Sequence, residues 1–440
     1  MRIYIKDLKN KIGEEVSISG WVNGRRDHGK LIFIDLRDMS GVVQTVVLPN
    51  HKDAHKEANL IRPEWVVEIK GKVNARPDKM ITEDENGNIE LEVFGIKIIS
   101  EAKELPFEKD TELNLDTYLD YLPLTLRTKE KQAVFKVQAC VVQAFRDFLI
   151  SEDFTEIQAP KIIGADAEGG AGVFEVDYFG NESYLATSPQ FYKQIMVGVF
   201  EKVFATGNVY RAEKHSTSRH INEYTSLDFE MGFIKDHTDI MEMENKFFQF
   251  LTKALKEKCQ KEFELLEVEI PEVPENIPSM KLKKAQEILK KEYGEDCVGE
   301  LDLEPQHERW LCEYSQKEFN SDFIFITHYP VEKRPMYTYE DENDKGFTKS
   351  FDLLFRGAEI TTGGQRIHDY DELVKAIEKK GLDPEKFSFY LQAFRYGLPT
   401  HGGIGMGLER LTAKLLNIKN IKEATLFPRE INRIDTLLNK

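Results

Sequence analysis

The sequence predicts an α+β protein in which a small β-barrel precedes a larger domain, built on an antiparallel sheet flanked by helices. Three features indicate this class. Short alternating strands separated by turns fill residues 14–100, a charged hairpin occupies residues 203–234, and stretches with helical spacing follow Thr128 and cover residues 238–320. A chain of 440 residues is long enough for two to three domains.

The composition is that of an ordinary globular protein, with 41% hydrophobic and 31% charged residues. The N-terminal MRIYIKDLKN has no apolar run and no stretch approaches a membrane span, so we expect a cytoplasmic protein without a membrane partner. The four cysteines are widely spaced, which argues against a zinc ribbon or a disulfide framework. Because the net charge is −17, any nucleic-acid surface must come from local basic patches.

Residues 1–103 are predicted to form the barrel, with an OB-fold as the natural candidate. The strands read EVSISGWVNGRR, LIFIDLRD, GVVQTVVL, WVVEIKGKV and IELEVFGIKIIS. Such barrels bind single-stranded nucleic acid by stacking bases on aromatic rings and following phosphates with cations. The side chains of Arg25, Arg26, Phe33 and Gln44 could supply these roles, although a single phenylalanine such as Phe33 is more often a core residue.

Residues 104–127 are polar and lack periodicity, which predicts a hinge before a second domain over residues 128–440. Thr128 is a candidate N-cap for a helix with one apolar stripe. That stripe consists of Val134, Val137, Val141, Phe145 and Phe148. Beyond the strand that follows, Gly169, Gly170 and Gly172 predict a flexible loop after Glu168.

The hairpin reads GNVYRAEKHSTSRHINEYTSLDFEMGFI over residues 207–234. In its second strand, period-two alternation places Leu227, Phe229, Met231 and Phe233 on one face, and Asp228 and Glu230 on the other. In its first strand Arg211 and Glu213 share a face, and residues 214–222 form a polar connection. An exposed sheet face with solvated charges would give the same pattern.

The rest of the chain alternates between helical and extended patterns. Residues 238–320 resemble a helical insertion rich in Lys and Glu, and strands return at DFIFITHYP and SFDLLFRGAEITTGGQRIHDY. The run GGIGMG then leads into a helix that carries Leu408, Leu411 and Leu415. No βαβ unit surrounds this run and no GxxxxGK occurs, which excludes a dinucleotide fingerprint and a P-loop.

Three of these segments together resemble one family. The hairpin is similar to motif 2 of class II aminoacyl-tRNA synthetases, SPQFYKQ at residues 188–194 to their amino-acid-binding segment, and GMGLER at residues 405–410 to motif 3. The helix, strand and proline over residues 128–160 resemble motif 1, the dimer interface. Nearly the whole chain resembles the aspartyl-tRNA synthetases of subclass IIb, of the archaeal and eukaryotic type.

The resemblance implies an ATP site with three catalytic residues, Arg211, Glu359 and Arg410. Arg211 would contact the α-phosphate and the substrate carboxylate, and Arg410 and Tyr224 would enclose the adenine. Arg219 and His220 would meet the β- and γ-phosphates. The remaining implied ATP-binding residues are Ala212, Glu213, Ile221, Gly407, Leu408 and Glu409.

The resemblance also implies a magnesium ion on Glu359 and Thr362, with Glu213 and Glu230 nearby. Family members usually carry serine where Thr362 stands, which leaves the hydroxyl but adds a methyl group. The implied aspartate-binding residues are Glu168, Gln190, Lys193, Arg211, Asp228, Thr362 and Arg366. Lys193 and Arg366 would hold the side-chain carboxylate, and asparagine would leave a buried guanidinium without its anion.

The family's anticodon-binding positions match Arg26, Phe33 and Gln44, which makes tRNA(Asp) the expected partner. His28 and Pro77 match loop positions linked to discrimination between tRNA(Asp) and tRNA(Asn), and such small or compliant residues predict an enzyme that also charges tRNA(Asn). An amidotransferase would then convert the Asp-tRNA(Asn). A turn-forming Pro77 and a solvent-exposed His28 without any role in tRNA choice are the alternative.

Two other functions are compatible with the sequence. An asparaginyl-tRNA synthetase would share the scaffold, although SPQFYKQ and EYTSLDFEM favour the aspartyl pattern. A non-catalytic tRNA-binding paralogue would be expected to have lost charged ligands, yet all six of the implied charged positions are occupied. They are Arg211, Glu213, Glu230, Glu359, Arg366 and Arg410.

Overall fold

The computed structural model describes residues 2–83, 86–108, 111–164 and 172–438. The chain divides into two compact units, Met1–Glu112 and Leu113–Lys440. None of the helices in these described ranges combines the length and the apolar composition that a bilayer span requires. Each unit has its own hydrophobic core, as the following paragraphs describe.

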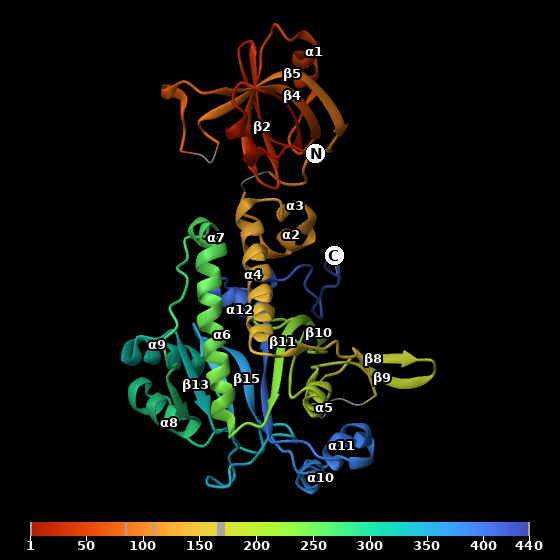
Figure 1. The fold of residues 1–440 in the computed structure, drawn as a ribbon, viewed down its shortest axis with the longest axis vertical. Coiled ribbons are helices and arrows are strands. Elements are labelled where there is room, and N and C mark those ends of the chain that lie inside the picture. The colour runs from red at the N-terminus through yellow and green to blue at the C-terminus, as the bar shows by residue number, and fades with distance from the viewer. Residues whose placement is uncertain (1, 84–85, 109–110, 165–171, 439–440) are drawn as a thin grey trace. The chain divides into compact units, whose positions relative to one another are not determined.

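The first unit is a closed five-stranded barrel, which confirms the predicted OB-fold (Figure 1). Its elements are η1 (Ile5–Lys11), β1 (Glu15–His28), β2 (Leu31–Asp38), β3 (Gly41–Val47), α1 (Lys52–Leu60), β4 (Val66–Ala75), η2 (Asp78–Met80) and β5 (Ile89–Ser100). The strand order is β1-β2-β3-β5-β4, and β4 pairs with β1 to close the barrel. The side chains of β2 alternate between the inside and the outside of the barrel, and Ile32, Ile34 and Leu36 fill its core.

The second unit contains an eight-stranded, mainly antiparallel sheet, which confirms the antiparallel sheet that the sequence predicts. Its strands are β6 (Thr155–Glu156), β10 (Lys202–Tyr210), β11 (Glu223–Gly232), β12 (Ser279–Lys281), β13 (Phe323–Thr327), β14 (Ser350–Phe355), β15 (Ala358–Arg366) and β16 (His401–Gly407). Their order is β12-β13-β14-β15-β16-β11-β10-β6, and only the two edge pairs are parallel. A separate small sheet contains β7 (Ile162–Ile163), β8 (Glu175–Tyr178) and β9 (Asn181–Leu185).

Helices pack against the large sheet of the second unit (Figure 1). The larger ones are α4 (Lys129–Ser151), α5 (Gln190–Phe200), α6 (His237–Lys258), α9 (Pro305–Phe319), α10 (Tyr370–Lys379), α11 (Ser388–Arg395) and α12 (Leu408–Leu415). The shorter ones are α2 (Leu115–Asp120), α3 (Leu122–Thr125), α7 (Gln260–Leu265), α8 (Leu282–Ile288), η3 (Leu289–Tyr293), η4 (Pro384–Phe387) and η5 (Ile421–Ala424). The helices α2 and α3 lie within residues 104–127, the segment predicted to be a hinge.

The main core lies between one face of the sheet and the helices α4, α6 and α12. The predicted cap of α4 is confirmed, because the Thr128 hydroxyl accepts a hydrogen bond from the Lys131 N–H at 3.3 Å. Phe145 of α4 packs edge-on against Phe204 and Phe247, with ring centroids 6.0 and 5.2 Å apart. Because this face is filled, the charged residues of β11 must point to the opposite face.

The alternation predicted for β11 is confirmed over its length. Leu227 and Phe229 are fully buried in the main core, while Asp228 faces a pocket on the other side of the sheet. The prediction for Phe233 was wrong: the strand ends at Gly232, and Phe233 adopts a positive φ of 56° and is 72% exposed. The chain turns there, so strand periodicity no longer applies to Phe233.

Candidate active site

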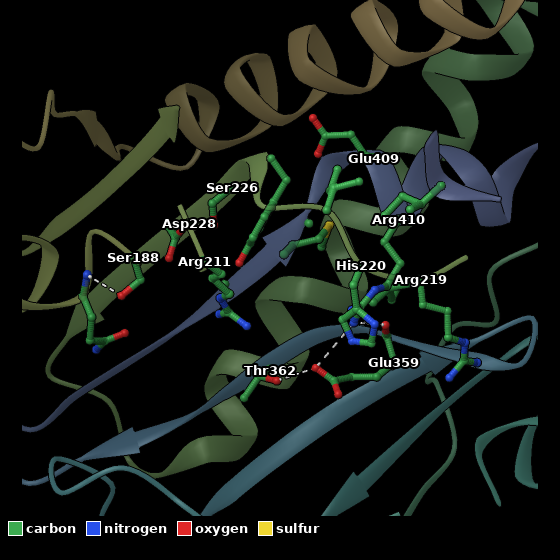
Figure 2. Close-up of a pocket in the computed structure, with 18 of the residues that line it drawn as sticks. Ser188, Arg211, Arg219, His220, Ser226, Asp228, Glu359, Thr362, Glu409 and Arg410 are labelled. Atoms are coloured by element: carbon green, nitrogen blue, oxygen red, sulfur yellow. Dashed lines mark hydrogen bonds and ion pairs between the residues drawn. The ribbon is translucent and has the colours of Figure 1, made fainter. Parts of the chain in front are cut away.

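The pocket lies on the face of the sheet opposite the main core, among β11, β15, β16 and the connection between β10 and β11 (Figure 2). It brings together fifteen of the predicted residues. They are Gln190, Lys193, Arg211, Glu213, Arg219, His220, Ile221, Tyr224, Asp228, Glu359, Thr362, Arg366, Gly407, Glu409 and Arg410. Segments far apart in sequence therefore build one site, as the three sequence motifs predicted.

Two of the predicted residues are placed differently, and a third is not described. Glu168 lies outside the described residues. Leu408 points its side chain into the main core, so only its backbone is available near the pocket. Ala212 does not line the pocket, and its N–H donates to the Gly172 carbonyl at 2.6 Å. That contact connects Gly172 to the segment that follows β10.

One end of the pocket is a buried cluster of two cations and two carboxylates. The Lys193 ammonium lies 3.0 Å from Asp228 and 3.3 Å from Glu230, and it also donates to the Ile404 carbonyl at 2.7 Å. Arg366 donates from Nε to Glu230 at 2.9 Å and from Nη2 to the Gly403 carbonyl at 2.9 Å. All four charged side chains are at least 94% buried.

The charges in this cluster balance, which explains how it can be buried. Burial opposes ionisation of Glu230, but the charges of Arg366 and Lys193 outweigh it and hold the pKa of Glu230 below its usual value. The sequence argument that Arg366 depends on a bound anion was therefore wrong, because Glu230 already neutralises one edge of the guanidinium. Lys193 and Arg366 nevertheless both line the pocket and can donate to a ligand.

The backbone approaches this cluster closely at Gly403. A Cβ atom there would lie 2.0 Å from the Phe229 carbonyl oxygen and 2.3 Å from Oε2 of Glu230. Glycine is therefore required for β16 to pair with β11 while Glu230 stays beneath it. The glycine run that resembled a nucleotide-binding fingerprint is in fact a strand lying against buried carboxylates.

The rest of the pocket carries three arginines and several carboxylates. Arg219 binds Glu308 at 3.1 Å and the Gly357 carbonyl at 2.8 Å, and Arg410 binds the Glu359 carbonyl at 2.9 Å. Arg211 lies over the Tyr224 ring, with its guanidinium carbon 5.6 Å from the centroid. Figure 2 shows Arg219 and Arg410 at the opposite end of the pocket from Ser188 and Asp228.

Glu359 and Thr362 project together from β15. The Thr362 hydroxyl donates to a Glu359 carboxylate oxygen at 2.8 Å, and both side chains line the pocket. The pKa of nearby Glu308 is raised, mainly because of burial, and the negative charge of Glu359 adds to the effect. This concentration of oxygen atoms could hold a hard divalent cation.

Glu409 lines the pocket and also makes a structural contact. Both of its carboxylate oxygens accept from the Thr225 N–H at 3.0 Å, so it fastens α12 to β11. Figure 2 shows its side chain turned away from Glu359. Burial raises the pKa of Glu409 to about 7.

The C-terminal segment holds the 214–222 connection, which sequence reasoning missed. Lys422 binds the Ser216 hydroxyl at 3.0 Å and Glu430 at 2.7 Å, and Ser216 also donates to Glu430. Asn222 and Ser218 make further backbone hydrogen bonds to this segment, at 2.7 and 3.0 Å. The connection that carries Arg219 and His220 is thus fixed by residues about 200 positions later in the chain.

Other residues that line the pocket were also missed. They are Ser188, Ser226, Tyr337, Ile360, Gly405, Met406 and Ile421. Ser226 could have been found, since it shares a strand face with Asp228, and its hydroxyl donates to that carboxylate. Tyr337 lies in an irregular segment, where no periodicity marks it. The centroid of its ring is 5.5 Å from the guanidinium carbon of Arg366.

Comparison with known proteins identifies the family. The family model described as tRNA synthetases class II (D, K and N) matches residues 114–431, and the one described as an OB-fold nucleic acid binding domain matches residues 16–103. The chain belongs to the class II tRNA synthetases. Its charged hairpin, β10 and β11 with their connection, lies within the matched residues, and we predict that it is motif 2.

Relatives of this class II synthetase match it over almost its full length. A protein of Deinococcus radiodurans named aspartate–tRNA(Asp/Asn) ligase is 46% identical, over 98% of both chains. A protein of the same name from Thermus thermophilus is 45% identical, over 99% of this chain and 100% of its own. The crystal structure of asparaginyl-tRNA synthetase from Pyrococcus horikoshii with asparaginyl-adenylate superposes with a TM-score of 0.92, at 31% identity and 99% coverage of both chains.

The barrel of this synthetase presents the predicted anticodon residues on one outer face. Arg26 pairs across the strands with Phe33, and its guanidinium lies 3.0 Å from Asp35 and 3.3 Å from Gln44. Phe33 is half-buried beside Ile32 and Ile34, which fill the core, so it is not itself a core residue. His28 packs edge-on against Phe33 at 5.6 Å, whereas Pro77 lies in the connection between β4 and β5.

Proposed function

We propose that this protein is an aspartate–tRNA ligase, which activates L-aspartate with ATP and transfers it to tRNA. The single observation that carries the proposal is the pair of cations, Lys193 and Arg366, buried at one end of a class II pocket. Two cations suit a carboxylate side chain, whereas the amide nitrogen of asparagine would direct its donors toward them. The names of the relatives from Deinococcus radiodurans and Thermus thermophilus support the same assignment.

ATP would bind at the end of the pocket that carries the arginines. Arg211 would neutralise the α-phosphate and orient the substrate carboxylate, while Arg219 and His220 would meet the β- and γ-phosphates. A Cβ atom built on Gly407 would lie 3.8 Å from Cβ of Arg410 and 3.9 Å from the Tyr224 ring, so these two side chains flank the glycine and could enclose an adenine. Catalysis would rest on positioning and charge stabilisation, because the nucleophile is the carboxylate of the substrate.

Class II aminoacyl-tRNA synthetases use ATP and typically Mg²⁺. The oxygen donors of Glu359 and Thr362 suit this hard cation, and the extra methyl group of threonine leaves the hydroxyl directed at Glu359. We propose that these two residues hold the ion, with Glu213 as a further carboxylate of the pocket. When bound, magnesium would neutralise phosphate charge during the transfer.

Pyrophosphate exchange with single amino acids tests the amino-acid assignment. Purified protein with Mg²⁺-ATP should exchange labelled pyrophosphate with aspartate and not with asparagine. Exchange with asparagine alone would make the protein an asparaginyl-tRNA synthetase, in line with the solved structure that it resembles. Exchange with neither amino acid would favour a non-catalytic tRNA-binding protein.

We further propose that the barrel binds the anticodon through Arg26, Phe33 and Gln44, and that it accepts both tRNA(Asp) and tRNA(Asn). Proline has no N–H to offer a base edge and no long side chain to clamp one, so discrimination at Pro77 would be weak. The Asp-tRNA(Asn) would pass to an amidotransferase. A roughly thousandfold weaker charging of tRNA(Asn), a difference of about 4 kcal/mol, would exclude relaxed specificity.

We also propose a homodimer formed through the motif 1 segment of residues 128–160. The strand β6 lies at an edge of the large sheet, and Ile150 near the end of α4 is 59% exposed, both of which a partner could cover. Light scattering at micromolar concentration should give the dimer mass. A monomer under these conditions would contradict this arrangement.

A further inference from the structure

The connection between β10 and β11 gathers a second set of possible metal ligands, separate from Glu359 and Thr362. One carboxylate oxygen of Glu213, one ring nitrogen of His215 and one of His220 all lie within 4.8 Å of one another. Nε2 of His215 is 3.6 Å and Nε2 of His220 is 3.9 Å from Oε2 of Glu213. The two imidazole rings meet edge-on, with centroids 4.9 Å apart.

We propose that Glu213, His215 and His220 bind a zinc-like transition-metal ion that competes with ATP for the motif 2 connection. Two imidazoles and one carboxylate are a common zinc ligand set, with a fourth position left to water. A tetrahedral ion with bonds near 2.1 Å needs ligand atoms about 3.4 Å apart. The two measured separations exceed this value by a few tenths of an ångström, which side-chain rotation can close.

The surroundings favour imidazole ligands over protonated side chains. Burial lowers the pKa of the His220 imidazole, and a neutral imidazole is the form that binds a metal. Its Nδ1 lies 2.7 Å from the Thr217 hydroxyl, and a proton on Nδ1 would leave Nε2 free to bind a metal. The Thr217 hydroxyl already accepts from the Arg219 N–H at 3.1 Å, so it is held in place.

Two arginines that act on His220 have acceptors of their own. Arg219 is bound to Glu308 and Arg410 to the Glu359 carbonyl, which reduces their opposition to a bound cation. His215 is 59% exposed and gives the ion a path from solvent. Magnesium would not take this site readily, because it prefers oxygen ligands and octahedral geometry.

Competition with ATP follows from the position of the site, and this step rests on the proposed function. Glu213 and His220 line the pocket where the triphosphate would lie, whereas His215 does not. An ion held by all three would occupy residues that ATP needs. Zinc should therefore inhibit at low ATP concentration and lose its effect as ATP rises.

Cobalt(II) is the probe, because its visible absorption reports tetrahedral coordination. The full-length protein without ATP should bind one Co²⁺ per chain with a tetrahedral spectrum, zinc should displace it, and Mg²⁺-ATP should release it. His215→Ala should weaken Co²⁺ binding roughly tenfold or more, since even changes to residues that only support metal ligands cost about 10- to 100-fold. The matched control is His55→Ala, which removes a partly exposed imidazole from the barrel unit and should leave Co²⁺ binding and its displacement by ATP unchanged.

The same variants separate this site from the proposed enzyme activity. Without zinc, His215→Ala should retain pyrophosphate exchange, and with zinc it should resist inhibition. Equal Co²⁺ affinity in His215→Ala and wild type, or the absence of stoichiometric binding, would overturn the metal site and leave the ligase proposal untouched. Co²⁺ binding that ATP does not displace would overturn the competition.

Discussion

Replacing Arg366 by lysine tests the amino-acid end of the pocket. The guanidinium makes two hydrogen bonds at 2.9 Å, to the Glu230 carboxylate and to the Gly403 carbonyl, and is 94% buried. A lysine has one nitrogen and cannot reproduce this fork. The proposed function adds a hydrogen bond from this guanidinium to the side chain of the bound aspartate. The loss of that charge-assisted bond would cost about 1.5–3 kcal/mol, which corresponds to a roughly ten- to hundredfold higher KM for aspartate.

Pyrophosphate exchange at varied aspartate measures this change, and the KM for ATP should hardly move because Arg366 lies at the other end of the pocket. The matched control is Arg334→Lys. Arg334 is also buried and binds Asp352 at 2.8 Å and Ser350 at 3.0 Å, but it does not line the pocket. An unchanged KM for aspartate in Arg366→Lys, or an equal rise in Arg334→Lys, would refute the reasoning.

Four further perturbations follow from the structure. Arg211→Ala should abolish adenylate formation because the α-phosphate loses its cation, and normal exchange would remove Arg211 from the site. Phe33→Ala should spare adenylate formation but weaken tRNA charging by about 1–3 kcal/mol if a base stacks there, and loss of both activities would contradict its place on the outer face of the barrel. Lys422→Met leaves the Glu430 carboxylate buried without its cation, which should lower the free energy of unfolding by about 3–5 kcal/mol in a thermal melt. It should also raise the KM for ATP, because Ser216 loses the hydrogen bond that Lys422 donates to it. An unchanged melting temperature would refute that role. Burial lowers the pKa of His401 from 6.5 to about 4. Its contribution to the free energy of unfolding should therefore be fully present above pH 6.5, and roughly 3 kcal/mol should be lost as the pH falls from there through about 4. Urea unfolding should show this loss in the wild type and much less of it in His401→Gln.

The spacing of apolar residues predicted the helices and strands whose buried face can be recognised within one segment of the sequence. Alternation marked the barrel strands and the two faces of β11, and the apolar stripe marked α4 with its Thr128 cap. It failed at Phe233, where the chain turns at a positive φ immediately after the strand. It also missed α1, which buries only the small residues Ala54 and Ala58 and so has no apolar stripe to detect.

Interactions between distant segments had no local signal. The ion pair of Lys422 with Glu430 reaches Ser216 across more than 200 residues, and neither charge stands out in its own segment. The pairing of Arg366 with Glu230 was equally hidden, because each residue alone looks like a ligand for substrate. The sequence identified which residues meet in the pocket but not which of them neutralise one another.

Charging of a tRNA(Asp) transcript tests the central proposal most directly. The purified protein, supplied with Mg²⁺-ATP and labelled aspartate, should form acid-precipitable Asp-tRNA(Asp) with the release of AMP, and it should accept a tRNA(Asn) transcript with comparable efficiency. Labelled asparagine should not be incorporated into either transcript. Incorporation of asparagine in place of aspartate, or of neither amino acid by a protein that binds both tRNAs, would contradict the proposed function.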